Sequence, residues 1–212
     1  MVTEERELRE ELIWVCRRLE VKGLVAASDG NMSCRVGEDR LLITPSGKCK
    51  GELKPEDLLV VDLCGERLTG AGKPSSEIRM HLLVYRERPD IQAIVHAHPP
   101  LLTGYTLAGT PFMAEALPEV WLTIGAVPTA PYATPTTQEV PDSIAPFVKS
   151  HQAILLECHG SLTFGKTLKE ACLRLEKLEH AAHTLLYAHL LDPRAPRSLP
   201  GTALSKLEQL RH

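Results

Sequence analysis

Apolar residues recur at helical spacing near both ends of this chain and form short runs between them. Residues 4–22 carry an apolar side chain at every third or fourth position, which predicts an amphipathic helix with Gly23 as its C-cap. Residues 167–191 show the same spacing behind Thr167-Leu168-Lys169-Glu170, which is typical of a capping box, and Asp192-Pro193 ends the pattern. The apolar faces consist of Leu8, Leu12, Val15 and Leu19 in the first helix and of Ala171, Leu175, Leu178, Ala182, Leu185 and His189 in the second.

Between these helices, short apolar runs separated by polar or glycine-containing turns predict strands. A polar turn at residues 28–31 leads into a strand that ends at Val36, and Gly37-Glu38-Asp39 forms a hairpin turn to the next one. Further turns are expected at residues 45–48 and 64–67. The remaining predicted strands are residues 40–44, 57–63, 91–95 and 153–156.

A helix is expected between Ser75-Ser76 and Pro89. Ser75 and Ser76 are candidate N-caps, and Glu77 suits the positive first turn of a helix. Pro89 stops the pattern, because the residue before a proline is biased away from helical geometry. One apolar face at helical spacing supports this prediction, namely Ile78, Leu82 and Tyr85.

The region between the central strands is harder to interpret because it is rich in proline. Helices are expected at residues 101–108 and 140–151. Within the proline-rich segment 111–135, residues 127–132 are compatible with an edge strand, since proline cannot donate a hydrogen bond to a central ladder.

Length and composition fit one globular domain. The 212 residues predict a domain over residues 1–192 and a tail over residues 193–212 that contains a short helix. A net charge of −3 argues against a nucleic-acid partner, and no apolar run is long enough to predict a membrane span. The charged N-terminal sequence is unlike a signal peptide, and the six cysteines form no C-x-x-C pair. We therefore expect free thiols and a cytoplasmic location.

The sequence His96-Ala97-His98 directly follows the apolar run 91–95. Because side chains alternate along a strand, His96 and His98 are expected on the same side, about 6.6–7 Å apart along it. Two imidazoles that face the same way can share a divalent metal. A pair of polar residues at a strand end explains this pattern equally well.

A third histidine changes that balance. His159 follows the apolar run 153–156, and Gly160 allows a sharp turn behind it. Alone, His159 is typical of a turn residue, but three histidines at strand ends suit a metal site with an open coordination position. Glu176, His180 and His183 share one helix face and are a second candidate group, although histidines on a helix surface need no ligand to explain them.

Three polar segments have the chemistry of an anion site. Gly30-Asn31 and Ser46-Gly47 offer backbone amides and polar side chains in turns. Ser75-Ser76 stands at a predicted helix N-terminus, where free amides and the helix dipole favour a phosphate. Each segment alone is compatible with plain turn or capping chemistry. Beside a metal, the three together indicate a small phosphorylated substrate.

These motifs, in this order, resemble the class II, zinc-dependent aldolase/adducin family, with L-fuculose-1-phosphate aldolase as the nearest type. The resemblance extends from about residue 5 to residue 190. It rests on G-N-M-S (30–33), I-T-P-S-G (43–47), P-S-S-E (74–77), H-A-H (96–98) and C-H-G (158–160).

The resemblance implies an α/β/α sandwich around a mainly antiparallel sheet, assembled as a homotetramer with sites at subunit interfaces. It implies that one Zn²⁺ per subunit is bound by His96, His98 and His159. It assigns Glu77 as the acid/base and as a fourth ligand in the empty site. The residues implied in phosphate and substrate binding are Gly30, Asn31, Ser46, Gly47, Ser75 and Ser76.

The activity implied is cleavage of a ketose 1-phosphate, similar to L-fuculose 1-phosphate, to dihydroxyacetone phosphate and a small aldehyde through an enediolate. One departure concerns the tyrosine that fuculose-phosphate aldolases supply from a neighbouring subunit, because residues 116–121 contain none. The alternatives are a methylthioribulose-1-phosphate dehydratase, an L-ribulose-5-phosphate 4-epimerase and an adducin-like interaction module. The epimerase typically has P-S-S-D and H-A-D-Y motifs, which differ from this sequence, and a module needs no metal ligands.

Overall fold

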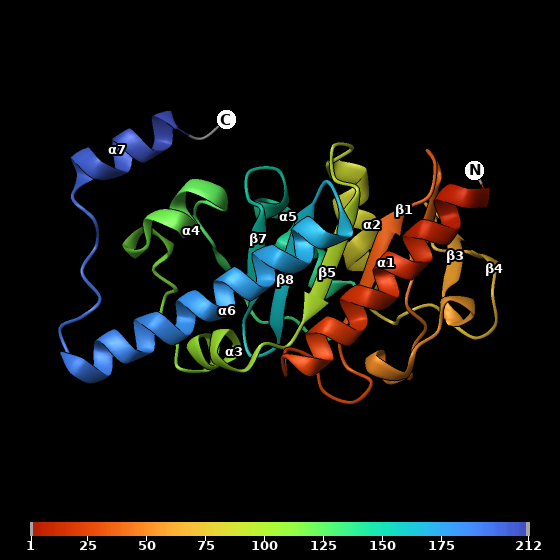
Figure 1. Ribbon diagram of the computed structural model, residues 1–212, viewed down its shortest axis with the longest axis horizontal. Coiled ribbons are helices and arrows are strands. Elements are labelled where there is room, and N and C mark those ends of the chain that lie inside the picture. Colours follow the sequence, from red (N-terminus) through yellow and green to blue (C-terminus); the bar gives the residue numbers. More distant parts are fainter. Residues whose placement is uncertain (1, 211–212) are drawn as a thin grey trace.

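Short apolar strands pair into one sheet, and helices cover both of its faces (Figure 1). The computed structural model describes residues 2–210, and within them the sheet has eight strands in the order β4-β3-β2-β1-β5-β8-β7-β6. Neighbouring strands are antiparallel except β6 and β7, which are parallel. The strands are β1 (Asn31–Arg35), β2 (Arg40–Ile43), β3 (Leu59–Asp62), β4 (Arg67–Thr69), β5 (Ala93–Ala97), β6 (Thr129–Ala130), β7 (Ala153–Leu156) and β8 (Gly160–Gly165).

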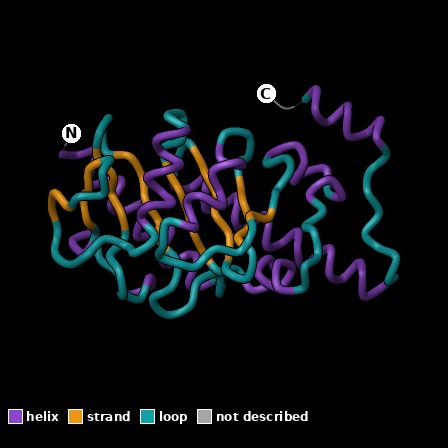
Figure 2. Tube along the Cα trace, turned by 180° about the vertical axis from the view of Figure 1, so that it is seen from behind, coloured by secondary structure: helices purple, strands orange, loops and turns teal. Residues whose placement is uncertain are grey.

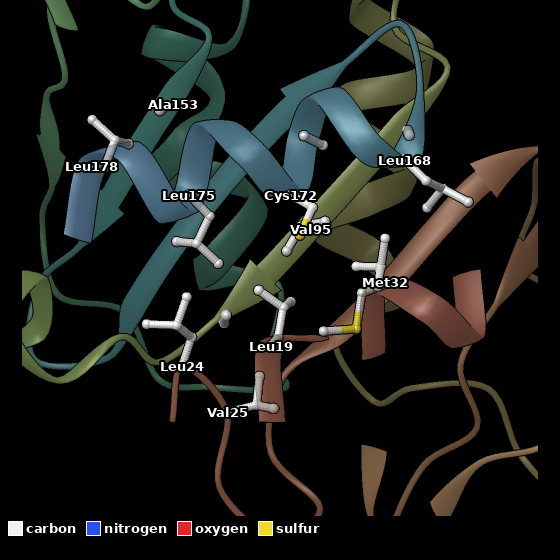
Figure 3. Close-up of a cluster of buried hydrophobic side chains, with 14 of the residues drawn as sticks. Leu19, Leu24, Val25, Met32, Val95, Ala153, Leu168, Cys172, Leu175 and Leu178 are labelled. Carbon is white, nitrogen blue, oxygen red and sulfur yellow. The ribbon is translucent and has the colours of Figure 1, made fainter. Parts of the chain in front are cut away.

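The helices form two layers, each with its own apolar core. One core lies between the sheet and the helices α1 (Val2–Val21), α3 (Pro100–Leu107), α4 (Pro118–Thr123) and α6 (Leu168–Leu191). Figure 3 shows Leu19 of α1 and Cys172 and Leu175 of α6 over Val95 of β5. The other core lies under α2 (Ile78–Glu87) and α5 (Glu139–Val148). The predicted α/β/α sandwich with a mainly antiparallel sheet is therefore confirmed.

Strand alternation decides which layer each residue of β5 faces. Ala93, Val95 and Ala97 belong to the core beneath α1 and α6, whereas Ile94 belongs to the core beneath α2. His96 follows the same alternation as Ile94 and is fully buried. The sheet therefore directs His96 toward the α2 layer.

Several local predictions are confirmed in detail. Gly23 has a φ of 67° and ends α1 in a Schellman motif, in which Gly23 N donates to Glu20 O and Leu24 N donates to Leu19 O. Thr167 caps α6, because its hydroxyl accepts a hydrogen bond from Glu170 N at 3.0 Å. The edge strand predicted within residues 127–132 is β6, with a proline on each side of it.

Other local predictions are wrong. Gly160 was expected to provide the sharp turn behind His159, but Cys158 provides the left-handed residue of that turn, and Gly160 begins β8, a strand that was not predicted and lies between β5 and β7. Helix α2 begins at Ile78 with Glu77 as its N-cap residue and no side-chain cap, although Ser75 and Ser76 were the expected caps. The turn expected at residues 64–67 is present, since Gly65 N donates to the Asp62 carbonyl at 3.0 Å, but the short strand β4 that follows it was not predicted.

Short helices appear where the sequence pattern predicted strand or loop. The segments Lys50–Glu52, Pro55–Asp57 and Ala114–Ala116 form 3₁₀ turns. The second of these occupies the start of the strand expected at residues 57–63, so that β3 begins only at Leu59. Helix α4 lies inside the proline-rich segment, with Pro118 at its first position.

Beyond α6, an extended segment separates the body from the helix α7 (Gly201–Gln209), as Figure 2 shows from behind. Helix α7 contacts α4, and its residues are partly or fully exposed. The helix expected in the tail is confirmed, while the division at residue 192 into domain and tail stays a prediction. No helix within residues 2–210 is long and apolar enough to span a bilayer.

Candidate metal centre

Three imidazoles converge at the ends of β5 and β7. Candidate ligand atoms of His96, His98 and His159 lie within 4.8 Å of one another. The Nε2 atoms of His96 and His98 are 3.0 Å apart, and the three ring centroids are 4.9–5.0 Å apart. Among residues 2–210, this is the group of histidine, cysteine and acidic side chains that could hold a metal ion.

The backbone around β5 orients the first two rings. His96 Nδ1 donates a hydrogen bond to the Ser161 carbonyl at 3.0 Å, so its Nε2 carries the free lone pair. His98 N donates to the Leu24 carbonyl, which fixes the chain just beyond the strand. Burial, followed by the nearby His96 and His159, lowers the pKa of His98 to about 3, and a neutral imidazole is the form that binds a metal.

His159 stands in the tight turn between β7 and β8. Cys158, with a φ of 56°, provides the left-handed turn residue, and its N donates to Thr106 Oγ1 at 3.1 Å. Gly160 is required for a different reason than the sequence indicated. A Cβ on Gly160 would lie 2.5 Å from the Ala97 carbonyl oxygen and 2.7 Å from His98 Cδ2, so only glycine lets this turn approach β5.

Glu77, at the start of α2, lies beside the three histidines. Its Oε2 lies 3.2 Å from His96 Nε2, and its Oε1 lies 3.2 Å from His159 Nε2. Burial raises the pKa of Glu77, but the neighbouring His96 and His159 more than offset this and hold it well below the ordinary range. As the N-cap residue of α2, Glu77 also lies at the positive end of a helix dipole.

The chemistry of this donor set fits a divalent cation. Nitrogen ligands at about 2.0–2.1 Å from a tetrahedral zinc ion are about 3.3 Å apart. The spacings of 3.0 Å between His96 and His98 and of 3.2 Å from each of two histidines to Glu77 are close to that value. Two imidazole nitrogen atoms that face each other at 3.0 Å gain from a shared cation, since both can direct a lone pair at it.

The three segments predicted to bind an anion lie around this centre. Gly30 packs under β5, where a Cβ would lie 2.9 Å from the His96 carbonyl oxygen. Ser46 N donates to the Lys73 carbonyl, and Pro45 forms a β-bridge with Pro74, so that the Ser46-Gly47 loop lies beside Ser75-Ser76. The exposed members of this set are Ser46, Gly47 and Ser76.

Two of the predicted anion residues make different contacts from those expected. The side-chain amide of Asn31 donates to Glu77 Oε2 at 2.9 Å. Ser75 Oγ accepts a hydrogen bond from Glu77 N at 3.3 Å. Both side chains therefore contact Glu77, and their role toward a phosphate stays a prediction.

Lys50 was not predicted and connects two of these segments. Its side chain is buried, and its Nζ donates to the Ser28 carbonyl at 2.6 Å and to the Lys48 carbonyl at 2.9 Å. Burial lowers the pKa of this ammonium group. No sequence signal distinguishes Lys50 from the neighbouring Lys48, because its role depends on a fold that brings residues 28 and 48 together.

The second candidate group does not assemble. Glu176 pairs with Arg18 and Lys22 of α1. His183 Nε2 is 3.7 Å from Glu179, which in turn accepts hydrogen bonds from the first free amides of α3. These contacts account for Glu176 and His183 without a metal ion.

Comparison with known proteins adds to this geometry. A family model described as "Class II Aldolase and Adducin N-terminal domain" matches residues 10–186. A 3-oxo-tetronate 4-phosphate decarboxylase of Pectobacterium atrosepticum is 32% identical over 97% of this chain and 94% of its own length. A 5-methylthioribulose-1-phosphate/5-deoxyribulose-1-phosphate aldolase of Rhodospirillum rubrum is 34% identical over 94% of this chain and 89% of its own. Among solved structures, an L-fuculose 1-phosphate aldolase superimposes with a TM-score of 0.86 at 30% identity, covering 96% of this chain and 95% of that protein.

Proposed function

Because the chain belongs to the family of class II aldolases and adducin N-terminal domains, we propose that it is a metal-dependent lyase that forms the enediolate of a small phosphorylated ketone. The observation that supports this most directly is the convergence of three imidazoles and one carboxylate at a single point. Burying three imidazoles and a carboxylate together costs free energy. An interaction module would gain nothing from such a cluster.

In this proposal His96, His98 and His159 hold a divalent cation, for which we propose Zn²⁺ because the ligand set is three imidazole nitrogen atoms. When bound, the ion supplies a Lewis acid that polarises the substrate oxygens and stabilises negative charge. Backbone groups of the protein hold the imidazole rings in place. The Ser161 carbonyl fixes the tautomer of His96, and the tight turn at Cys158 places His159 opposite it.

Glu77 transfers the proton at the enediolate carbon. It lies within 3.2 Å of two candidate ligands and is ionised, so it can accept a proton from a carbon whose acidity is raised by an adjacent carbonyl. The Ser46-Gly47 and Ser75-Ser76 segments, with the backbone of the Gly30-Asn31 turn, bind the phosphate. Lys50 draws the Ser28 and Lys48 carbonyls together beneath them.

Two cleavage reactions lead to the same enediolate. Aldol cleavage of a ketose 1-phosphate releases an aldehyde and leaves the enediolate of dihydroxyacetone phosphate. Loss of carbon dioxide from a 3-oxo-tetronate 4-phosphate leaves that enediolate as well. Both reactions then require a proton at the same carbon. In this proposal the ionised Glu77 first takes a proton from solvent water and then delivers it to that carbon, and in the reverse direction it removes the proton again.

We propose the aldol cleavage as the first candidate and the decarboxylation as the second. Aldol cleavage needs a further base to take the hydroxyl proton of the carbon that becomes the aldehyde. Decarboxylation needs no such base, because the leaving carboxylate carries no proton. Residues 116–121 contain no tyrosine that could be this further base, which favours the decarboxylation. The similarity to the decarboxylase of Pectobacterium atrosepticum favours it as well.

The test supplies both substrate classes to metal-loaded protein and follows dihydroxyacetone phosphate with a coupled enzyme. Release of aldehyde from a ketose 1-phosphate supports the aldolase, and release of carbon dioxide from the 3-oxo acid supports the decarboxylase. Chelation should abolish either activity. Loss of water from methylthioribulose 1-phosphate, or epimerisation of L-ribulose 5-phosphate without cleavage, would instead support the alternatives.

We further propose that the chain forms a homotetramer in the cytoplasm. A tetramer would give sedimentation at about four times the mass of the chain, and a fully active monomer would contradict a site at a subunit interface. The reducing compartment is supported by the cysteines, all six of which are free thiols within the described residues.

A further inference from the structure

A buried chain of four hydrogen bonds runs from α2 back to Glu77. Tyr85 Oη lies 2.8 Å from Ser33 Oγ, and Ser33 Oγ lies 2.6 Å from His81 Nδ1. His81 Nε2 then lies 2.5 Å from Asn31 Oδ1, and Asn31 Nδ2 donates to Glu77 Oε2 at 2.9 Å. The exposed fraction of each intermediate residue is 3% or less, so water does not compete for these bonds.

The chemistry of each group fixes the direction of donation. The Glu77 carboxylate can only accept, so Asn31 presents its NH₂ group to Glu77 and its carbonyl oxygen to His81. His81 Nε2 must then carry a proton. Burial lowers the pKa of His81 to about 3, so the ring is neutral and its Nδ1 accepts from the Ser33 hydroxyl. Ser33 has donated its proton and accepts in turn from Tyr85.

The Tyr85 end of this chain of hydrogen bonds is anchored as well. The Arg35 guanidinium lies over the Tyr85 ring at 4.9 Å and donates to the Tyr85 carbonyl at 2.6 Å. Tyr85 and His81 project from one face of α2, and Ser33 and Asn31 project from β1 on the side that faces that helix. Helix α2 and strand β1 therefore hold every residue of this chain of hydrogen bonds in place.

We propose that this chain of hydrogen bonds positions Glu77 for proton transfer, with Oε2 as the anchored oxygen and Oε1 as the oxygen that exchanges a proton with the substrate carbon. The inference rests on the proposed function and deepens it. Glu77 Oε1 lies 3.2 Å from His159 Nε2, but among the described residues it accepts no hydrogen bond of good geometry although it is buried, so it is the oxygen available to the substrate. His81 is a positioning residue, and the Asn31 side chain serves Glu77 instead of the phosphate.

The central experiment compares His81→Leu with His81→Gln. Glutamine places its amide nitrogen close to the position of the imidazole Nε2 and can still donate to Asn31, whereas leucine cannot. The readout is exchange of the dihydroxyacetone phosphate proton with deuterated water, which isolates the step assigned to Glu77. We expect His81→Leu to slow exchange by about 10- to 100-fold, because small displacements of a catalytic group are costly. His81→Gln should restore most of the rate.

Metal content and the binding of phosphoglycolohydroxamate, an enediolate mimic bearing a phosphate, should stay near the wild-type values in both variants. Equal exchange rates in the leucine and glutamine variants would overturn the proposal. Wild-type protein that shows no exchange at all would instead refute the proposed function, so the two failures are distinguishable.

Two further measurements cover the case in which His81→Leu does not fold. Ser33→Ala removes the donor to His81 and should also slow exchange. Its matched control is Thr163→Ala, which removes another buried hydroxyl, one that donates to the Ala171 carbonyl at 2.9 Å and lies outside the chain. The control should exchange at the wild-type rate, and equal rates in both variants would contradict the proposal.

The second measurement is independent of activity. Nitrogen-15 NMR of imidazole-labelled, metal-free protein should show His81 with its proton on Nε2. A proton on Nδ1 would reverse the polarity of the chain and overturn the proposal.

Discussion

Gly160→Ala would place a methyl group in the tightest contact of the candidate metal centre. The added Cβ would lie 2.5 Å from the Ala97 carbonyl oxygen and 2.7 Å from His98 Cδ2. Ordinary van der Waals contact begins at about 3.4–3.5 Å, so the turn before β8 and the end of β5 would have to separate by about 0.9 Å. Because Ala97 pairs with Ser161, the contact with its carbonyl oxygen can be relieved only by a shift of the backbone at the end of β5, and the His98 ring, which the new methyl group also contacts, moves with it.

Two effects of different size follow. Overpacking of this kind costs about 1–3 kcal/mol, so the free energy of unfolding should fall by that amount. Displacement of a metal ligand should lower metal affinity by about 10- to 100-fold, the range found when groups that orient ligands are removed. The first effect is measured by urea unfolding of metal-free protein at matched concentration, and the second by competition with a chromophoric chelator.

Gly104→Ala is the matched control. Gly104 lies inside α3, and a Cβ there would meet no atom within 4 Å. Alanine is favoured over glycine in a helix by about 0.5–1 kcal/mol, so this variant should be slightly more stable and bind metal normally. If Gly160→Ala were as stable as the wild type and bound metal equally well, the close approach of this turn to β5 would be refuted.

Three further predictions test other parts of the site. Wild-type protein should bind about one metal ion per chain, and elemental analysis should show its loss when His96→Ala and His98→Ala are combined; undiminished metal would place the site elsewhere. Lys50→Met removes the ammonium group that joins the Ser28 and Lys48 carbonyls and should weaken phosphoglycolohydroxamate binding by calorimetry, whereas unchanged affinity would show that the loops hold without it. His81 has a folded-state pKa of about 3, below its usual value, so the unfolded state binds an extra proton at acidic pH. The stability of metal-free protein should therefore fall by about 1.4 kcal/mol per pH unit on this account as the pH drops below about 6.5, and His81→Gln should flatten that slope in acid unfolding.

The three histidines could be predicted because strand geometry constrains them strongly. An apolar run followed by His96-Ala97-His98 places both rings on one side of a strand whatever the rest of the fold does. His159 follows the other strongly apolar run. Because both groups stand at strand ends, one shared metal site was the simplest interpretation. The layers of the sandwich and the caps of α1 and α6 likewise depend on local patterns that a sequence shows directly.

The groups that were not predicted depend on tertiary contacts. Strand β8 is six residues long, begins and ends with glycine, and has weak alternation, so its structure comes from pairing with β5 and β7 on both sides. The chain of hydrogen bonds behind Glu77 joins residues 48–52 positions apart in the sequence at Ser33. Spacing along the polypeptide gives no sign of β8, and for the hydrogen bonds behind Glu77 it shows only that Glu77 and His81 are at i and i+4 at the start of α2.

The most direct test of the account is the exchange of the dihydroxyacetone phosphate proton with deuterated water, measured for wild-type protein and for Glu77→Gln. The exchange needs a metal centre, a bound phosphate and a positioned base, but no aldehyde or carboxylate substrate. We expect the wild type to exchange only when loaded with metal. Glu77→Gln should retain metal and phosphate-mimic binding and lose about 10²–10⁴ in exchange rate, the usual contribution of a general acid/base. A glutamine variant that exchanges at the native rate would contradict the account and leave Glu77 as the N-cap residue of α2.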